Sequence, residues 1–160
     1  MSSVDSRAKA EATIDFVLAL MAREGGAWVE AASLSMSPLI RPGDRLRLSA
    51  LDPAGARPGT MVAYRRGDTL VVHRLLRRTP AGFVTKGDAL TDIDPPVAAG
   101  EIVGRVAAIR SPDGRLLDLE RAPWPQIGAA LALVAGIRGA NPIVWKVLRI
   151  PFYLAASFRR

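Results

Sequence analysis

Residues 60–86 read TMVAYRRGDTLVVHRLLRRTPAGFVTK, and this stretch decides the fold. It contains three short runs rich in β-branched and aromatic residues, separated by the turn sequences Arg66-Gly67-Asp68 and Pro80-Ala81-Gly82. Glycine tolerates the positive φ that tight turns require, and proline fixes φ at a turn position. The stretch therefore predicts three consecutive strands joined by tight turns.

The same pattern continues on both sides of this stretch, from Ala27 to Leu119. The apolar and β-branched runs predict the strands Trp28–Ala31, Arg45–Leu51, Thr60–Tyr64, Leu70–Arg77, Phe83–Lys86, Ile102–Arg110 and Arg115–Leu119. Strands at this spacing favour an antiparallel, partly closed, barrel-like sheet over βαβ units. We therefore expect a fold that is mainly β.

A helix is predicted before the sheet, in residues 6–24. Ile14, Val17, Leu18 and Met21 follow a spacing that places them on one apolar face, and two glycines end the pattern. The chain is thus expected to have three regions: an N-terminal helix in residues 1–26, a β-rich domain in residues 27–120, and a basic, apolar, helical tail in residues 121–160.

The tail contains no Asp or Glu after Glu120. Its apolar stretches, residues 124–137 and 142–158, are too short or too interrupted to span a bilayer, which takes ~20 residues. Two interpretations stay open: peripheral contact of residues 121–160 with an anionic membrane, or helices that cover one side of the sheet. Neither a secretory signal nor a spanning anchor is predicted, so we expect a cytoplasmic or membrane-surface location.

The composition narrows the possible chemistry. The chain has 160 residues, a formal net charge of +7, no cysteine and one histidine. These counts exclude disulfides, thiolate metal sites, a cysteine nucleophile and sites with several imidazoles, and they leave His73 as the single imidazole base. We expect no metal and no cofactor. Aromatic residues make up 6% of the chain and no nucleic-acid motif occurs, so no nucleic-acid partner is expected.

Three segments together carry the groups that nucleophilic hydrolysis requires. Ser33 and Ser35 lie in a serine-rich segment, His73 lies in an apolar run, and Asp88 and Asp94 follow the next predicted strand. A serine hydroxyl needs an adjacent base, and an imidazole can take and return its proton near neutral pH. A carboxylate on the second ring nitrogen fixes the tautomer of that base. Taken singly, each of these residues also fits an ordinary structural role.

These residues stand in three boxes with a fixed order: Ser35-Met36-Ser37-Pro38 followed by Gly43-Asp44, then His73-Arg74, then Lys86-Gly87-Asp88 followed by Asp94. In this combination the chain resembles the superfamily of serine peptidases that contains signal peptidase I and LexA, in its signal-peptidase branch. Most bacterial signal peptidases have lysine at the position of His73, and histidine there is similar to the archaeal and endoplasmic-reticulum type. The resemblance covers about residues 32–107.

The resemblance implies the signal-peptidase and LexA peptidase fold and a serine endopeptidase that cuts a peptide or preprotein, after a small residue. It implies that Ser35 is the nucleophile and His73 the general base, and that Asp94 or Asp88 orients the histidine. It also implies that the Ser33 hydroxyl assists the Ser35 N–H in binding the oxyanion.

Three alternatives to an active peptidase stay open. These alternatives are a catalytically inactive relative, a non-enzymatic binding module of the same fold, and a self-cleaving LexA-like regulator. In the family the self-cleaving regulators use a Ser–Lys pair, whereas this chain has His73 at the position of the base.

Overall fold

The computed structural model describes residues 3–136 and residue 150. All seven predicted strands are present, and their ends differ from the predicted ends by no more than two residues. The strands are β1 (Ala27–Glu30), β2 (Arg45–Ser49), β3 (Met61–Arg66), β4 (Thr69–Thr79), β5 (Gly82–Lys86), β6 (Ile102–Arg110) and β7 (Leu116–Asp118). Two short 3₁₀ helices, Pro53–Gly55 and Ala99–Glu101, lie in the connections.

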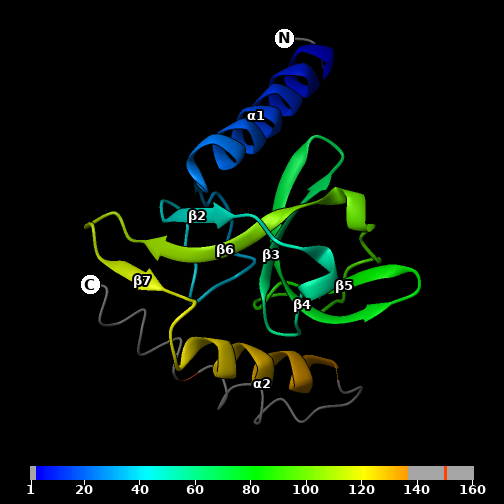
Figure 1. Ribbon diagram of the computed structural model, residues 1–160, viewed down its shortest axis with the longest axis vertical. Coiled ribbons are helices and arrows are strands. Elements are labelled where there is room, and N and C mark those ends of the chain that lie inside the picture. Colours follow the sequence, from blue (N-terminus) through cyan, green and yellow to red (C-terminus); the bar gives the residue numbers. More distant parts are fainter. Residues whose placement is uncertain (1–2, 137–149, 151–160) are drawn as a thin grey trace.

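The strands form one antiparallel sheet in the order β1-β2-β6-β3-β4-β5, and β7 pairs with β6 beside this path (Figure 1). The prediction of a mainly β, antiparallel fold is confirmed, but the predicted partial closure is wrong. β1 and β5 stand at the two ends of the strand order, and no pairing joins them among the described residues. The segment that follows β5 takes up its outer edge instead, because Val97 and Phe83 exchange backbone hydrogen bonds of 2.8 and 2.9 Å.

The predicted N-terminal helix is α1 (Ser3–Glu24), which lies at one end of the molecule (Figure 1). Ile14, Val17 and Met21 are buried, as their spacing predicts. Leu18, on the same apolar face, is 42% exposed, so the sheet covers only part of that face. α1 packs on the sheet mainly through β1. Because one strand makes most of this contact, it buries a smaller part of the helix surface than the apolar residues of α1 span.

The second helix, α2 (Trp124–Gly136), lies at the other end of the view and packs against β4 (Figure 1). It buries Gly128, Leu131 and Ala132, so this part of the predicted tail covers the sheet. Of residues 121–160, for which membrane contact stays a prediction, residues 137–149 and 151–160 lie outside the described residues. In the part of the chain that the structure describes, neither α1 nor α2 combines the length and hydropathy of a membrane-spanning helix.

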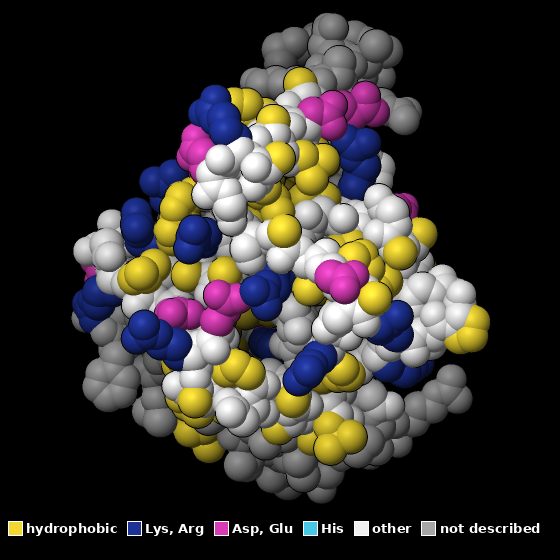
Figure 2. Space-filling model, viewed as in Figure 1, with side chains coloured by type: hydrophobic (Ala, Val, Ile, Leu, Met, Phe, Trp, Pro, Cys, Tyr) yellow, Lys and Arg dark blue, Asp and Glu magenta, His cyan; other side chains and the backbone are white. Residues whose placement is uncertain are grey.

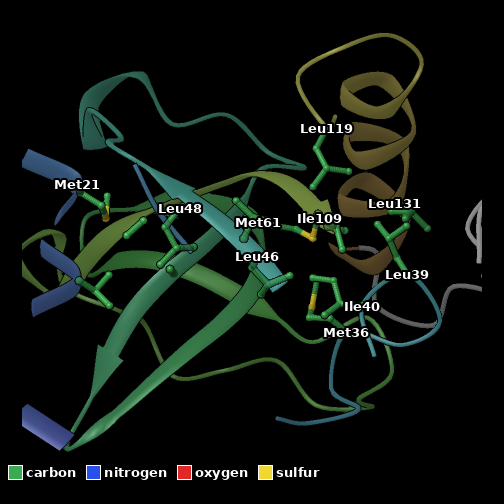
Figure 3. Packing of buried hydrophobic residues seen from close by; sticks show 14 residues of the cluster. Met21, Met36, Leu39, Ile40, Leu46, Leu48, Met61, Ile109, Leu119 and Leu131 are labelled. Carbon is green, nitrogen blue, oxygen red and sulfur yellow. The ribbon is translucent and has the colours of Figure 1, made fainter. Parts of the chain in front are cut away.

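One apolar cluster joins the sheet to both helices (Figure 3). The cluster contains Leu131 of α2 together with side chains from β2, β3 and β6. The turn after the predicted nucleophile contributes Met36, Leu39 and Ile40, each no more than 2% exposed. Because these side chains belong to the core, they fix an irregular segment that has few backbone hydrogen bonds of its own.

Basic side chains are spread over the face of the molecule that Figure 2 shows. In this view Lys and Arg are interspersed with hydrophobic and acidic side chains. Some of them pair with acids, as Arg105 does with Glu120 and Arg121 with Asp118. The positive charge of the chain is therefore not confined to residues 121–160.

Candidate active site

β4 presents consecutive residues to opposite sides of the sheet, as the alternation of a strand requires. His73 and Arg74 are both buried, with 4% and 2% of their surfaces exposed. Their partners differ, since His73 contacts Asp94 whereas Arg74 contacts Asp88. The two acidic residues that the sequence leaves as alternatives therefore belong to different sides of one strand.

The carboxylate of Asp94 contacts the Nδ1 atom of His73. The distance from Nδ1 to Asp94 Oδ2 is 2.6 Å, and both side chains are more than nine-tenths buried. The Asp94 backbone N–H donates to the Thr85 carbonyl at 2.9 Å, which fixes the acidic segment along the edge of β5. A carboxylate on Nδ1 holds the ring proton at that nitrogen, so Nε2 keeps the free electron pair that a base requires.

Three further side chains surround Asp94, and sequence reasoning missed all of them. Thr85 Oγ1 donates to Asp94 Oδ2 at 2.8 Å, and the Tyr64 hydroxyl donates to the same oxygen at 3.3 Å. Arg66 Nη1 donates to Asp94 Oδ1 at 3.3 Å, and Arg66 Nη2 donates to the Tyr64 hydroxyl at 2.9 Å. Asp94 is thus held in place from several directions.

The register of β3, β4 and β5 brings these side chains to one face. Val62 pairs with His73, so Tyr64 and Arg66, further along β3, share the face of the histidine. Thr85 on β5 pairs with the β4 residue two positions beyond His73 and lies on the same face. A polar residue inside a strand usually faces solvent, and only the register shows that these three converge on one carboxylate.

The surroundings of Asp94 favour its ionised form. Burial raises the pKa of its carboxyl, but the hydrogen bonds from His73 and Thr85 and the charge of Arg66 outweigh burial and hold the pKa below its usual 3.8. Burial raises the pKa of the Tyr64 hydroxyl above its usual 10.0. At neutral pH Asp94 is therefore an acceptor for several donors, and Tyr64 is one of those donors.

Ser35 lies in the connection between β1 and β2, and its Oγ is 3.1 Å from the Oγ of Ser33. Both serines line the same cleft as His73. Among the described residues no hydrogen bond joins Ser35 to His73, and the Ser35 hydroxyl pairs with Ser33 instead. Hydrogen bonds between nucleophile and base are often long without substrate and tighten when substrate binds.

Asp88 lies away from the histidine, in a buried ion pair with Arg74. Its carboxylate accepts from Arg74 Nε at 2.8 Å and from Nη2 at 2.6 Å. Beside it, the Ala89 N–H donates to the Ser35 carbonyl at 2.8 Å. Gly87 lies so close that a Cβ at this position would meet the same carbonyl oxygen at 2.8 Å. Residues 87–89 therefore support the turn of the predicted nucleophile, and Asp88 makes no described contact with His73.

The cleft has a volume of about 630 Å³, and its walls are mostly apolar side chains from α1, β1 and the first half of β4. Residues 69–73 of β4 pair with β3 only, because the pairing with β5 begins at Arg74. β1 in turn pairs with β2 only. Two strand edges that have no further strand among the described elements therefore flank the cleft, and such edges can pair with an extended chain.

Of the five predicted site residues, Ser33, Ser35 and His73 line this cleft, Asp94 contacts the His73 ring, and Asp88 lies apart from them. No family model matches the chain, and no curated protein matches it. Within residues 3–136, no group of His, Asp and Glu side chains is arranged to hold a metal ion. The chemistry that the geometry offers is a hydroxyl and an oriented imidazole in one cleft.

Proposed function

We propose that the chain is a serine endopeptidase of the signal peptidase I type, with the fold of that superfamily. The observation that carries the proposal is the 2.6 Å contact between His73 Nδ1 and Asp94 Oδ2, because His73 lines the same cleft as Ser35. A buried, oriented imidazole near a serine hydroxyl is the arrangement that activates this hydroxyl for attack on a carbonyl carbon.

In the first half of the reaction, Ser35 Oγ attacks the carbonyl carbon of the peptide bond while His73 Nε2 takes the hydroxyl proton. Asp94 keeps the proton on Nδ1 and stabilises the imidazolium that forms. The Ser35 N–H and the Ser33 hydroxyl donate to the oxyanion, a role that suits Ser33 because its Oγ lies 3.1 Å from that of Ser35. The imidazolium then protonates the leaving amine as the C–N bond breaks.

In the second half, water attacks the ester that remains on Ser35. His73 Nε2 takes a proton from the water and returns one to Ser35 Oγ as the carboxylic acid product leaves. Because both halves use the same base, the loss of His73 stops the reaction at either stage.

The strand edges beside the cleft favour a peptide in extended conformation. Such a peptide can add to the edge of β1 and to residues 69–73 of β4, where backbone hydrogen bonds hold the main chain and pockets select side chains. The family resemblance adds the expectation of a small residue before the cut.

The proposal is tested by incubating the protein with a mixed peptide library and identifying the products by mass spectrometry. We expect products from the wild type and none from Ser35→Ala or His73→Ala. Ser37→Ala is the matched control, because it removes a hydroxyl from the same turn at a residue that does not line the cleft. Circular dichroism and thermal unfolding check that each variant folds. Undiminished cleavage by Ser35→Ala overturns the proposal.

Other outcomes identify the alternatives. A folded wild type that cleaves no peptide of the library is an inactive relative or a binding module. If the wild-type chain shortens itself at a bond before Ser35 while Ser35→Ala stays intact, the protein is a self-cleaving regulator.

A further inference from the structure

Arg66 differs from the other side chains around Asp94 because it alone of the three also lines the cleft. It ends β3, before the turn at Gly67, and its side chain is 46% exposed. Among the described residues that line the cleft, Arg66 is the one arginine and Glu30 is the one carboxylate. The described lining of the cleft therefore offers a single guanidinium, near His73, among walls that are otherwise mostly apolar.

The described contacts of Arg66 use only part of its capacity to donate hydrogen bonds. A guanidinium carries five N–H groups in a planar fork. Nη1 and Nη2 donate to Asp94 Oδ1 and to the Tyr64 hydroxyl, and the guanidinium lies 5.2 Å from the centre of the Tyr64 ring. No described contact uses Nε. Donors on the exposed side of Arg66 are thus available to a ligand in the cleft.

Asp94 does not depend on Arg66 for its position. The Arg66 contact to the Asp94 carboxylate is 3.3 Å long, whereas the contacts from His73 and Thr85 are 2.6 and 2.8 Å long. Charge-assisted hydrogen bonds are usually about 2.7–2.9 Å long, and exposed ion pairs contribute little to stability. Arg66 can therefore turn toward a second acceptor while Asp94 stays on the histidine.

We propose that Arg66 is a specificity-determining residue that selects peptides with a carboxylate next to the apolar part that fills the cleft. This inference rests on the proposed function, because it concerns the substrate of the same site. A planar guanidinium fits a carboxylate through two parallel hydrogen bonds, and the apolar walls weaken competition from water. The carboxylate belongs to an Asp or Glu side chain or to the free C-terminus of the peptide.

The test compares the peptides of a mixed library that are cleaved by the wild type, by Arg66→Gln and by Arg66→Glu. For the wild type we expect Asp and Glu to be enriched about fivefold at one position relative to the cut, as for one favourable exposed charge pair. Arg66→Gln removes this enrichment, and Arg66→Glu replaces it with enrichment of Lys and Arg. Libraries with free and with amidated C-termini distinguish a side-chain carboxylate from a terminal one.

Arg65→Gln is the matched control. It removes the same charge from the adjacent residue, which contacts Asp15 at 3.4 Å and does not line the cleft. Equal loss of acidic selection in Arg65→Gln and Arg66→Gln means that overall charge is responsible, and this overturns the inference. An equal content of acidic residues in the products of the wild type and Arg66→Gln also overturns it. The comparison uses the ratio of acidic to other peptides among the products of each variant. A variant that cleaves all peptides more slowly keeps this ratio, so a lower overall rate is not mistaken for a loss of selection.

A binding measurement separates the failure of this inference from the failure of the proposed function. The same library is passed over immobilised Ser35→Ala protein, with and without Arg66→Gln, and the retained peptides are sequenced. Retention of acidic peptides that requires Arg66, without cleavage by the wild type, supports the inference and contradicts the peptidase. Cleavage without acidic selection supports the peptidase and contradicts the inference. If neither cleavage nor selective retention occurs, both are wrong.

Discussion

Replacing Asp88 with asparagine is expected to destabilise the fold far more than it damages the chemistry. The change leaves the Arg74 guanidinium at 2% exposure without its carboxylate. Removing one partner of a buried ion pair costs about 3–5 kcal/mol, out of a total stability of about 5–15 kcal/mol. In a chain of this size each kcal/mol shifts Tm by about 2–4 °C, so we expect Tm to fall by about 6–20 °C.

Asp94→Asn is expected to show the opposite pattern. It leaves no buried charge behind, because Thr85 and Tyr64 are hydroxyls and Arg66 is 46% exposed. The amide oxygen can still accept a hydrogen bond, so the loss of stability is about 1 kcal/mol. However, the amide no longer holds the His73 tautomer with its proton on Nδ1, and the proposed peptidase activity falls by about 10³–10⁴-fold.

The two variants are compared by urea unfolding and by kcat/KM on a peptide that the wild type cleaves. Asp113→Asn is the control, because Asp113 pairs with Arg115 at the surface and the loss of such an exposed pair has little effect on the free energy of unfolding. The reasoning is refuted if Asp94→Asn destabilises the protein more than Asp88→Asn does. It is also refuted if Asp88→Asn, measured where it is fully folded, loses more activity than Asp94→Asn, because Asp88 is then the residue that orients the base.

Gly87→Ala should lower kcat/KM by about 100-fold, because its Cβ meets the Ser35 carbonyl oxygen at 2.8 Å and displaces the nucleophile turn. Gly100→Ala, where a Cβ meets nothing within 4 Å, should leave the activity unchanged, and equal activity of both variants contradicts the prediction. Stability should also depend on pH through Asp94. Its folded pKa lies below the usual 3.8, so its contribution is complete above that value and is lost as pH falls through the folded pKa. In urea unfolding, the stability difference between the wild type and Asp94→Asn should therefore disappear in strong acid, and a difference that stays constant with pH would contradict this linkage.

The strands were predictable because local chemistry marks their ends. Gly67 and Gly82, which the sequence places in tight turns, have φ values of 60° and 126°, where glycine alone is unstrained. The closure of the sheet was not predictable, because it depends on twist summed over all strands and on the bulges between them. The exposure of Leu18 was not predictable either, since apolar spacing shows one face of a helix but not how much of that face a neighbouring element covers.

The sequence predicts which chemical groups make up the candidate site, but it does not predict how they are arranged in space. Asp88 and Asp94 follow the same strand, and the sequence alone does not decide between them. Their roles depend on the side of β4 that each reaches, and this follows from the register of β4 with β5. Tyr64, Arg66 and Thr85 were missed for the same reason, because their convergence on one carboxylate is a property of the pairing between strands.

One segment, residues 86–94, connects the proposed nucleophile to the proposed base. In its first part the Ala89 N–H donates to the Ser35 carbonyl at 2.8 Å, and the Asp88 N–H donates to the Met36 sulfur at 3.4 Å. In its last part Asp94 holds His73 Nδ1 at 2.6 Å. Since no hydrogen bond joins the serine to the histidine among the described residues, this segment and the core below it set the relative position of the two groups. Asp88 and Asp94 therefore act on opposite halves of the proposed site, Asp88 through support of the turn and Asp94 through orientation of the ring.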